Sequence, residues 1–356
     1  MFILQTKKSK SGFRIIFFDI FAFKKLHNMI GAIIGDIVGS RFEFKNHRST
    51  DFELFGDGCS YTDDTITTIA IADAILHGIP YKESLIKWCR KYNGRQVIYG
   101  FSFRNWIMSD NPQPYNSYGN GSAMRVSPIG FAFDNSVKIM EEAKKSAECS
   151  HSHEEGIKGA QSIAISIFGL ANKIWENSKE GVENICKLYY GDDYLKRIPK
   201  KGQWDSTCQG CVPLSMHIFS NSNNFEDAIR KAISYGGDSD TIGAIVGSLA
   251  GAYYDIPKEI EETAMSYLPS EMIRVIVDFK RRFPKNNKTH FSGNKDPLFT
   301  SLHDDPYMKW PDRRICHDCL NKLPLQGSEC DVFENVVDVN NAINTGKCEF
   351  YIKKKQ

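Results

Sequence analysis

Two segments of the chain carry a glycine at every fourth position within otherwise apolar runs. They are residues 31–40 and 243–252. Residues four apart lie on one face of an α-helix, and glycine costs about 1 kcal/mol in a helix interior relative to alanine. Such a face indicates a helix that another backbone approaches closely. Two independent close contacts would also explain the pattern. If the two helices instead pack together, residues 35–45 come near residues 236–241.

Most of the remaining apolar pattern also has helical spacing. Apolar residues recur every three to four positions over 66–76, 157–174, 225–233 and 260–268, whereas the alternation typical of strands is scarce. Residues 112–121 are rich in proline, asparagine and glycine and predict a loop. The sequence therefore predicts an all-α domain with functional loops.

A change in composition after Arg282 marks the end of this domain. A polar linker follows over residues 284–297. A length of 356 residues would allow two domains of roughly 150 residues each. We expect instead one core domain over residues 29–285, a flexible N-terminal extension over 1–28, and a linker with a small irregular extension over 286–356.

The charge balance argues against nucleic acid as a partner. The chain has 45 Lys and Arg against 43 Asp and Glu, a net charge of +2. Residues 1–28 hold six cations and one anion, or +5, which leaves −3 for the rest. Nucleic-acid binders show a clustered basic face, and membrane spans need about 18 consecutive apolar residues. We therefore expect no nucleic acid, no membrane and a monomer.

The cysteines indicate a reducing compartment. Ten thiols are scattered through a chain long enough to need no disulfides, and Asp19 interrupts the one run that resembles a signal peptide. We expect a cytoplasmic protein. Cys208 and Cys211 have redox-motif spacing, but their context favours two buried thiols. Four further cysteines could hold a structural zinc ion, or the tail is metal-free, because they form one CxxC pair where zinc ribbons use two. These cysteines are Cys316, Cys319, Cys330 and Cys348.

Two short strings carry most of the chemical information. They are Tyr-Thr-Asp-Asp-Thr at 61–65 and Gly-Gly-Asp-Ser-Asp-Thr at 236–241. Each begins a helical pattern, where one carboxylate would serve as a cap and favour the positive end of the helix dipole. That structural role does not explain two carboxylates with threonine at both places.

If the glycine-bearing helices meet, four carboxylates share one pocket. Like charges so close need a partner, and neither string contains Lys or Arg. Hard oxygen ligands without thiolate or imidazole favour Mg²⁺ or Mn²⁺ over Zn²⁺, which predicts a two-metal hydrolytic site. A phosphatase of the haloacid-dehalogenase type, with Asp238 as nucleophile, is the rival. Its motif would end a hydrophobic strand, whereas here two glycines precede it.

Five strings in this order resemble the ADP-ribosylglycohydrolase family, which includes the dinitrogenase-reductase-activating glycohydrolase. The resemblance covers residues 29–285 and rests on five strings: Gly35-Asp36-Ile-Val-Gly39-Ser-Arg-Phe-Glu43, Tyr61-Thr-Asp-Asp-Thr65, Tyr118-Gly-Asn-Gly-Ser-Ala-Met-Arg125, Ser150-His151 and Gly236-Gly-Asp-Ser-Asp-Thr241. Any one string is weak, but all five together are specific.

The resemblance implies an all-α orthogonal bundle with a binuclear Mg²⁺ centre, for which Mn²⁺ is a substitute. The implied metal ligands are Thr62, Asp63, Asp64, Asp238, Asp240 and Thr241. The implied catalytic residues are Glu43, Asp63 and Asp240. The implied substrate-binding residues are Gly100, Ser117, Tyr118, Gly119, Asn120, Gly121, Ser122, Met124 and His151. Ser150 stands where the family commonly has threonine.

The same resemblance implies the reaction. It is hydrolysis of the bond at C1″ of ADP-ribose, linked to a protein side chain or to a small acceptor. In the loop at 116–124, exposed N–H groups around the glycines would bind phosphate and Tyr118 would stack on the nucleoside. Two alternatives stay open. One is an inactive relative that only binds ADP-ribose, and the other is a C-terminal tail that docks the protein on a partner.

Overall fold

The computed structural model describes residues 29–94, 97 and 99–284. The extensions expected over 1–28 and 286–356, and with them the four cysteines of the suggested zinc site, lie outside the described residues. The core domain expected over 29–285 coincides with the described part except for its last residue and the small internal gap.

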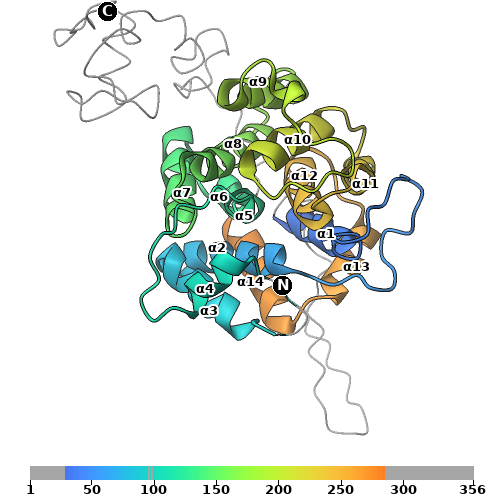
Figure 1. Ribbon diagram of the computed structural model, residues 1–356. Helices are drawn as coiled ribbons and strands as arrows, with labels where there is room; N and C mark the ends of the chain where they lie inside the picture. Colours follow the sequence, from blue (N-terminus) through green and yellow to red (C-terminus); the bar gives the residue numbers. More distant parts are fainter. Residues whose placement is uncertain (1–28, 95–96, 98, 285–356) are drawn as a thin grey trace, which may run out of the picture.

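The described residues form helices joined by loops, and they contain no strand (Figure 1). The first half comprises α1 (Ile30–Ser40), α2 (Asp63–His77), α3 (Tyr81–Lys91), α4 (Phe101–Met108), α5 (Gly121–Met124), α6 (Ser127–Ala132) and α7 (Ser136–Glu148). The second half comprises α8 (Glu154–Ala171), α9 (Ser178–Tyr190), the 3₁₀ turn η2 (Tyr194–Lys196), α10 (Cys208–Ser220), α11 (Phe225–Tyr235), α12 (Ser239–Tyr253), α13 (Lys258–Ser266) and α14 (Ser270–Arg282).

These elements confirm the all-α prediction. Helices α2 and α11 cover the segments 66–76 and 225–233, α8 and α13 cover all but the last two or three residues of 157–174 and 260–268, and residues 112–118 form a loop. Within the described part of the chain, no helix is long and apolar enough to cross a membrane.

Helices α1 and α12 meet along their glycines, as the four-residue spacing predicts. A Cβ atom built on Gly31, Gly35, Gly243 or Gly247 would come closer than 3.0 Å to a backbone atom of the opposite helix. Real Cβ atoms essentially never approach so closely, so only glycine fits at these four positions. The close approach places the C-terminal end of α1 against the N-terminal end of α12, where a Cβ on Gly39 would lie 2.5 Å from the Cα of Asp240.

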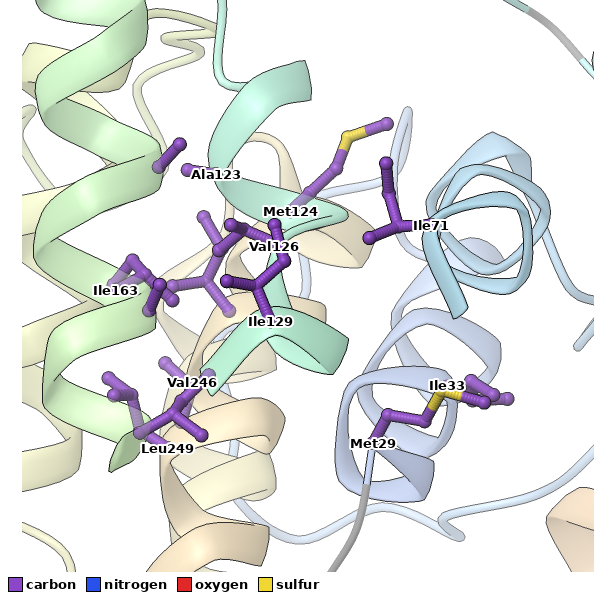
Figure 2. Close-up of a cluster of buried hydrophobic side chains, with 14 of the residues drawn as sticks. Met29, Ile33, Ile71, Ala123, Met124, Val126, Ile129, Ile163, Val246 and Leu249 are labelled. Atoms are coloured by element: carbon purple, nitrogen blue, oxygen red, sulfur yellow. The ribbon is translucent and has the colours of Figure 1, made fainter. Parts of the chain in front are cut away.

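The core lies between this helix pair and α8, and the short helices α5 and α6 fill the middle. Figure 2 shows Val126 and Ile129 between Ile163 of α8 and Ile71 of α2. Val246 of α12 lies below them in the same view, and all of these side chains are buried. This packing fixes α5, which carries the end of the predicted substrate loop, against the helices that carry the carboxylates.

The two cysteines with redox-motif spacing are buried free thiols, as expected. Cys208 and Cys211 lie in the first turn of α10 and neither is exposed. Burial raises the pKa of the Cys208 thiol to about 12. A thiol so rarely ionised is a weak nucleophile, so the pair contributes packing.

Candidate metal centre

Asp36 joins the C-terminal half of α1 to the start of α2. It is fully buried, and both of its carboxylate oxygens accept hydrogen bonds from the first turn of α2. Oδ1 accepts from the Thr62 hydroxyl at 2.7 Å, and Oδ2 accepts from the N–H groups of Thr62 at 2.9 Å and Thr65 at 3.1 Å and from the Thr65 hydroxyl. Asp36 therefore fixes where α2 begins and orients the Thr62 hydroxyl.

Asp64 and Asp240 face each other across the ends of α2 and α12. One oxygen from each, with one from Asp36, lies within 4.8 Å of the others. Asp64 and Asp240 are buried, and the Oδ1 atom of each has no hydrogen-bond partner among the described residues. The Oδ2 atom of Asp64 accepts hydrogen bonds of 3.4 Å from the hydroxyls of Thr62 and Thr241. A buried carboxylate oxygen without a partner is costly, and the group to which these two oxygens belong could hold a metal ion.

Asp63 and Asp238 complete the acidic cluster. Asp63 is half-buried at the first position of α2, and Asp238 is the buried N-cap residue of α12. Asp238 Oδ2 accepts a hydrogen bond of 2.7 Å from the Asn120 amide. The structure thus brings both strings to one place, as the glycine spacing predicts.

The surroundings of the cluster favour the neutral forms of its carboxyls. Burial raises the pKa of Asp63 and Asp64 well above the usual value, and the negative charge of Asp36 raises both further. Burial also raises the pKa of Asp240, to which the charge of Asp238 adds. Carboxylates that lack a cation repel one another in this way. A set of hard oxygen donors fits Mg²⁺ or Mn²⁺.

Glu43 lies beside the cluster without belonging to it. The residue is half-buried in the turn that follows α1. Burial, and then the charges of Asp238 and Asp36, raise the pKa of its carboxyl to about 7. A carboxyl with a pKa near neutrality is suited to proton transfer.

The predicted substrate loop runs along the other side of Asp238. Backbone pairing with the segment before α10 holds it, because Asn120 N donates to Ser206 O at 2.8 Å and Cys208 N donates to Tyr118 O at 2.9 Å. The ring of Tyr118 is 49% exposed. The Gly119 N–H already donates to Ser117 Oγ.

A comparison with models of known protein families shows the family to which the chain belongs. The model described as ADP-ribosylglycohydrolase matches residues 26–284. The chain belongs to this family. A 25% identical relative is the ADP-ribosylhydrolase ARH3 of Bos taurus, with 69% of this chain aligned to 89% of that one. Another is the ADP-ribosylarginine hydrolase Tri1 of Pseudomonas putida, 24% identical, with 70% of this chain aligned to 76% of that one.

A solved structure shares the fold of this ADP-ribosylglycohydrolase-family chain. It belongs to an ADP-ribosylglycohydrolase-related protein complex and aligns with a TM-score of 0.56 at 22% identity. The alignment covers 72% of this chain and 97% of that one. The all-α architecture is therefore the architecture of the family.

The structure differs from the sequence prediction in the family's substrate loop. Free N–H groups were expected around its glycines, and that expectation is wrong for Gly119 and Asn120, whose N–H groups are bonded within the protein. Ser122 donates to Gly156 O at 2.7 Å, and Met124 is buried. These residues support the loop from within the protein, and Tyr118 is its exposed aromatic side chain.

His151 and Gly100 have different surroundings. His151 is buried under the loop, with Nδ1 2.8 Å from Ser150 Oγ and Nε2 directed at Gly121. Burial, and then the charge of Arg125, lower the pKa of His151 well below its usual value, so the ring is neutral and shapes the loop. Gly100 is exposed before α4, and no residue that the structure describes lies within 4 Å of a Cβ built on it.

Sequence reasoning missed the role of Asp36 in this family member. A usable signal was present, because Asp36 is the only charged residue between positions 29 and 40, inside the glycine-bearing helix. A lone acid in an apolar helix must find hydrogen-bond donors when buried. The threonines of the 61–65 string are those donors.

Proposed function

We propose that this protein is a magnesium-dependent ADP-ribosyl hydrolase. It would cleave the C1″ glycosidic bond between ADP-ribose and a protein side chain or small acceptor. The observation that carries this proposal is the pair of unpartnered buried oxygens, Asp64 Oδ1 and Asp240 Oδ1. Relatives named as ADP-ribosyl hydrolases support the substrate class.

The residues that would hold two Mg²⁺ ions come from the two strings at the ends of α2 and α12: Thr62, Asp63, Asp64, Asp238, Asp240 and Thr241. Mn²⁺ would substitute, because the same oxygen ligands suit it. When bound, the ions would supply positive charge to the ribose oxygens and to the attacking water. Asp36 lies outside this ligand set, since both of its oxygens are already engaged by α2.

Glu43 is the residue proposed for proton transfer. Cleavage at C1″ needs a proton to be taken from the attacking water and one to be given to the leaving acceptor. The half-buried position of Glu43 beside the cluster, where burial raises the pKa of its carboxyl, supports this role. Asp63 and Asp240, beside it, would stabilise the positive charge that develops at C1″.

The substrate side is proposed at the loop that Asn120 joins to Asp238. The amide contact of 2.7 Å fixes this loop relative to the carboxylates. The exposed ring of Tyr118 would stack on the nucleoside, and Gly100 leaves open space before α4. A ligand held there would present its distal ribose to the cluster.

The test is release of ADP-ribose measured on a panel of linkages, namely arginine, serine, poly(ADP-ribose) and O-acetyl-ADP-ribose. We expect release from at least one linkage with Mg²⁺, and none in EDTA. Release that is unaffected by EDTA would refute the metal centre. Binding of ADP-ribose with no release from any linkage would favour the alternative, an inactive relative that only binds.

A further inference from the structure

Two exposed aromatic side chains are stacked beside the carboxylate cluster. Phe44 and Trp204 are 68% and 46% exposed, with ring centroids 5.7 Å apart and an interplanar angle of 11°. Phe44 directly follows Glu43 in the chain. Trp204 lies against the start of α12, since a Cβ built on Gly237 would be 3.8 Å from its Cα. The pair, called the aromatic rim below, therefore borders the site near Glu43 and Asp238.

The aromatic rim is held in place by one amide. Asn46 Nδ2 donates to Gly202 O at 3.0 Å, and Asn46 Oδ1 accepts from Gly237 N at 2.6 Å. This residue ties the segment of Phe44 to the segment of Trp204 and ties both to the start of α12. The rim is therefore built before any ligand arrives, which lowers the entropy lost on binding.

On the side away from Glu43 and Asp205 in the chain, the two segments that form the aromatic rim carry positive charge. Residues 44–48 and 199–204 contain no Asp or Glu. Their four cations are exposed, and none forms an ion pair with another of the described residues: Lys45, Arg48, Lys200 and Lys201. The guanidinium of Arg48 packs against Gly202, so the two segments present their charges on one surface.

We propose that the aromatic rim and these four cations bind the polypeptide that carries the ADP-ribosyl group, and that they favour an acidic stretch in it. The inference rests on the proposed hydrolase function. The surface is continuous with the site, and its charge is complementary to acidic side chains. Exposed aromatic residues are enriched where proteins bind one another.

A peptide fits this surface better than a nucleic acid. Nucleic-acid binding depends on many contacts to a continuous line of phosphates. The basic surface is short, and acidic residues follow it closely on the same segment, at Asp51, Glu53 and Asp57. Two or three acidic side chains would match four cations, whereas a longer phosphate chain would meet repulsion.

The first test compares two substrates that share the linkage the wild-type enzyme cleaves. One is an ADP-ribosylated acidic peptide and the other is the same ADP-ribosylated amino acid alone. In Phe44→Ala/Trp204→Ala and in Lys200→Glu/Lys201→Glu, we expect kcat/KM on the peptide to fall ~10-fold, mostly through KM. The value for the amino acid should stay within about twofold. Lys144→Glu/Lys145→Glu on α7 is the matched control and should change neither value.

Several outcomes would overturn the inference. Equal losses on both substrates would place the rim in the ADP-ribose pocket, and no loss on the peptide would remove its role. A second arm needs no catalysis: fluorescence anisotropy with the labelled, unmodified acidic peptide, its neutral counterpart and oligothymidylate. We expect the acidic peptide to bind best and Lys200→Glu/Lys201→Glu to weaken it, and preferred binding of oligothymidylate would contradict this. If the wild type releases no ADP-ribose yet this binding pattern holds, only the proposed function fails.

Discussion

Asp64 and Asp73 lie on the same helix, α2, and are almost equally buried, at 2% and 3% exposure. Asp73 accepts hydrogen bonds from Lys87 and Trp88, each of 2.8 Å, and lies 2.9 Å from the ring of His77. Asp64 has one oxygen without any partner among the described residues.

The pKa shifts of these two carboxyls have opposite directions. Burial raises the pKa of Asp64 well above its usual value, and the charge of Asp36 raises it further. Burial acts on Asp73 too, but its bonds to Lys87 and Trp88 outweigh burial and lower the pKa. The fold thus supplies a charged ammonium and an indole N–H to Asp73, whereas the carboxylate of Asp64 receives only hydroxyl donors and keeps one oxygen unpartnered among the described residues.

The largest effect is expected when each acid is changed alone. Asp64→Asn should lower ADP-ribose release ~10³-fold, because a metal ligand is lost, and should leave the metal-free protein at least as stable. Asp73→Asn should retain activity and lose ~1–3 kcal/mol of stability, because its charged hydrogen bonds are broken. Urea unfolding in EDTA, together with release assays, measures both. If the two changes had equal effects on stability or on ADP-ribose release, Asp64 and Asp73 would not have different roles.

A change in the glycine contact between α1 and α12 should lower both the stability and the activity of the protein. Gly35→Ala puts a Cβ into the backbone of Gly243, and overpacking of this kind costs ~1–3 kcal/mol or more. Because this contact sets the distance between α1 and α12, activity should fall as well. Gly78 is not suitable as a control because its φ is positive, so Gly94→Ala is the control, since a Cβ there meets no described residue within 4 Å. A Gly35→Ala protein as stable as the control would contradict the close packing.

Asp36→Asn should separate positioning from metal ligation. The amide keeps one acceptor oxygen but cannot accept from all the donors of Thr62 and Thr65, so we expect a loss of ~1–2 kcal/mol in stability. The Thr62 hydroxyl would lose its fixed orientation, and more Mg²⁺ would be needed for half-maximal activity. Calorimetric Mg²⁺ titration checks this. Complete loss of Mg²⁺ binding would show that Asp36 is itself a ligand.

The smallest effect concerns pH. The folded pKa of Asp73 is below its unfolded value of about 3.9. Its contribution to stability is therefore fully present above about pH 4 and is lost as pH falls through the folded pKa. The stability difference between wild type and Asp73→Asn should shrink as unfolding is measured in steps below about pH 4. If the stability difference between the two proteins instead grows below about pH 4, the pKa of Asp73 is raised by folding and not lowered.

Much of the fold and of the site could be predicted because their causes are local. Glycine at every fourth residue predicted two helices that another backbone approaches closely, with a contact between α1 and α12 as one of two explanations, and the structure shows that contact. The strings at 61–65 and 236–241 carry both the helix starts and the carboxylates, so predicting the helices also placed the acids.

What could not be predicted depends on distant contacts. Asp36 was not recognised because its donors, Thr62 and Thr65, are more than twenty residues away. The N–H group of Asn120 was expected to be free, since its bond to Ser206 in the segment before α10 has no sequence pattern. The N–H group of Gly119 instead donates within the loop, to Ser117 Oγ. The aromatic rim likewise joins residues 160 positions apart, which meet only in the folded chain.

The central claim is that the unpartnered oxygens of Asp64 and Asp240 bind a divalent cation. The most direct measurement is the melting temperature of the wild type, Asp64→Asn and Asp73→Asn against Mg²⁺ concentration. Binding to the folded state alone stabilises it by ~2.7 kcal/mol at a hundredfold excess over Kd. The melting temperature should therefore rise in the wild type and in Asp73→Asn, and barely change in Asp64→Asn. Equal rises in all three proteins, or none in the wild type, would contradict the claim.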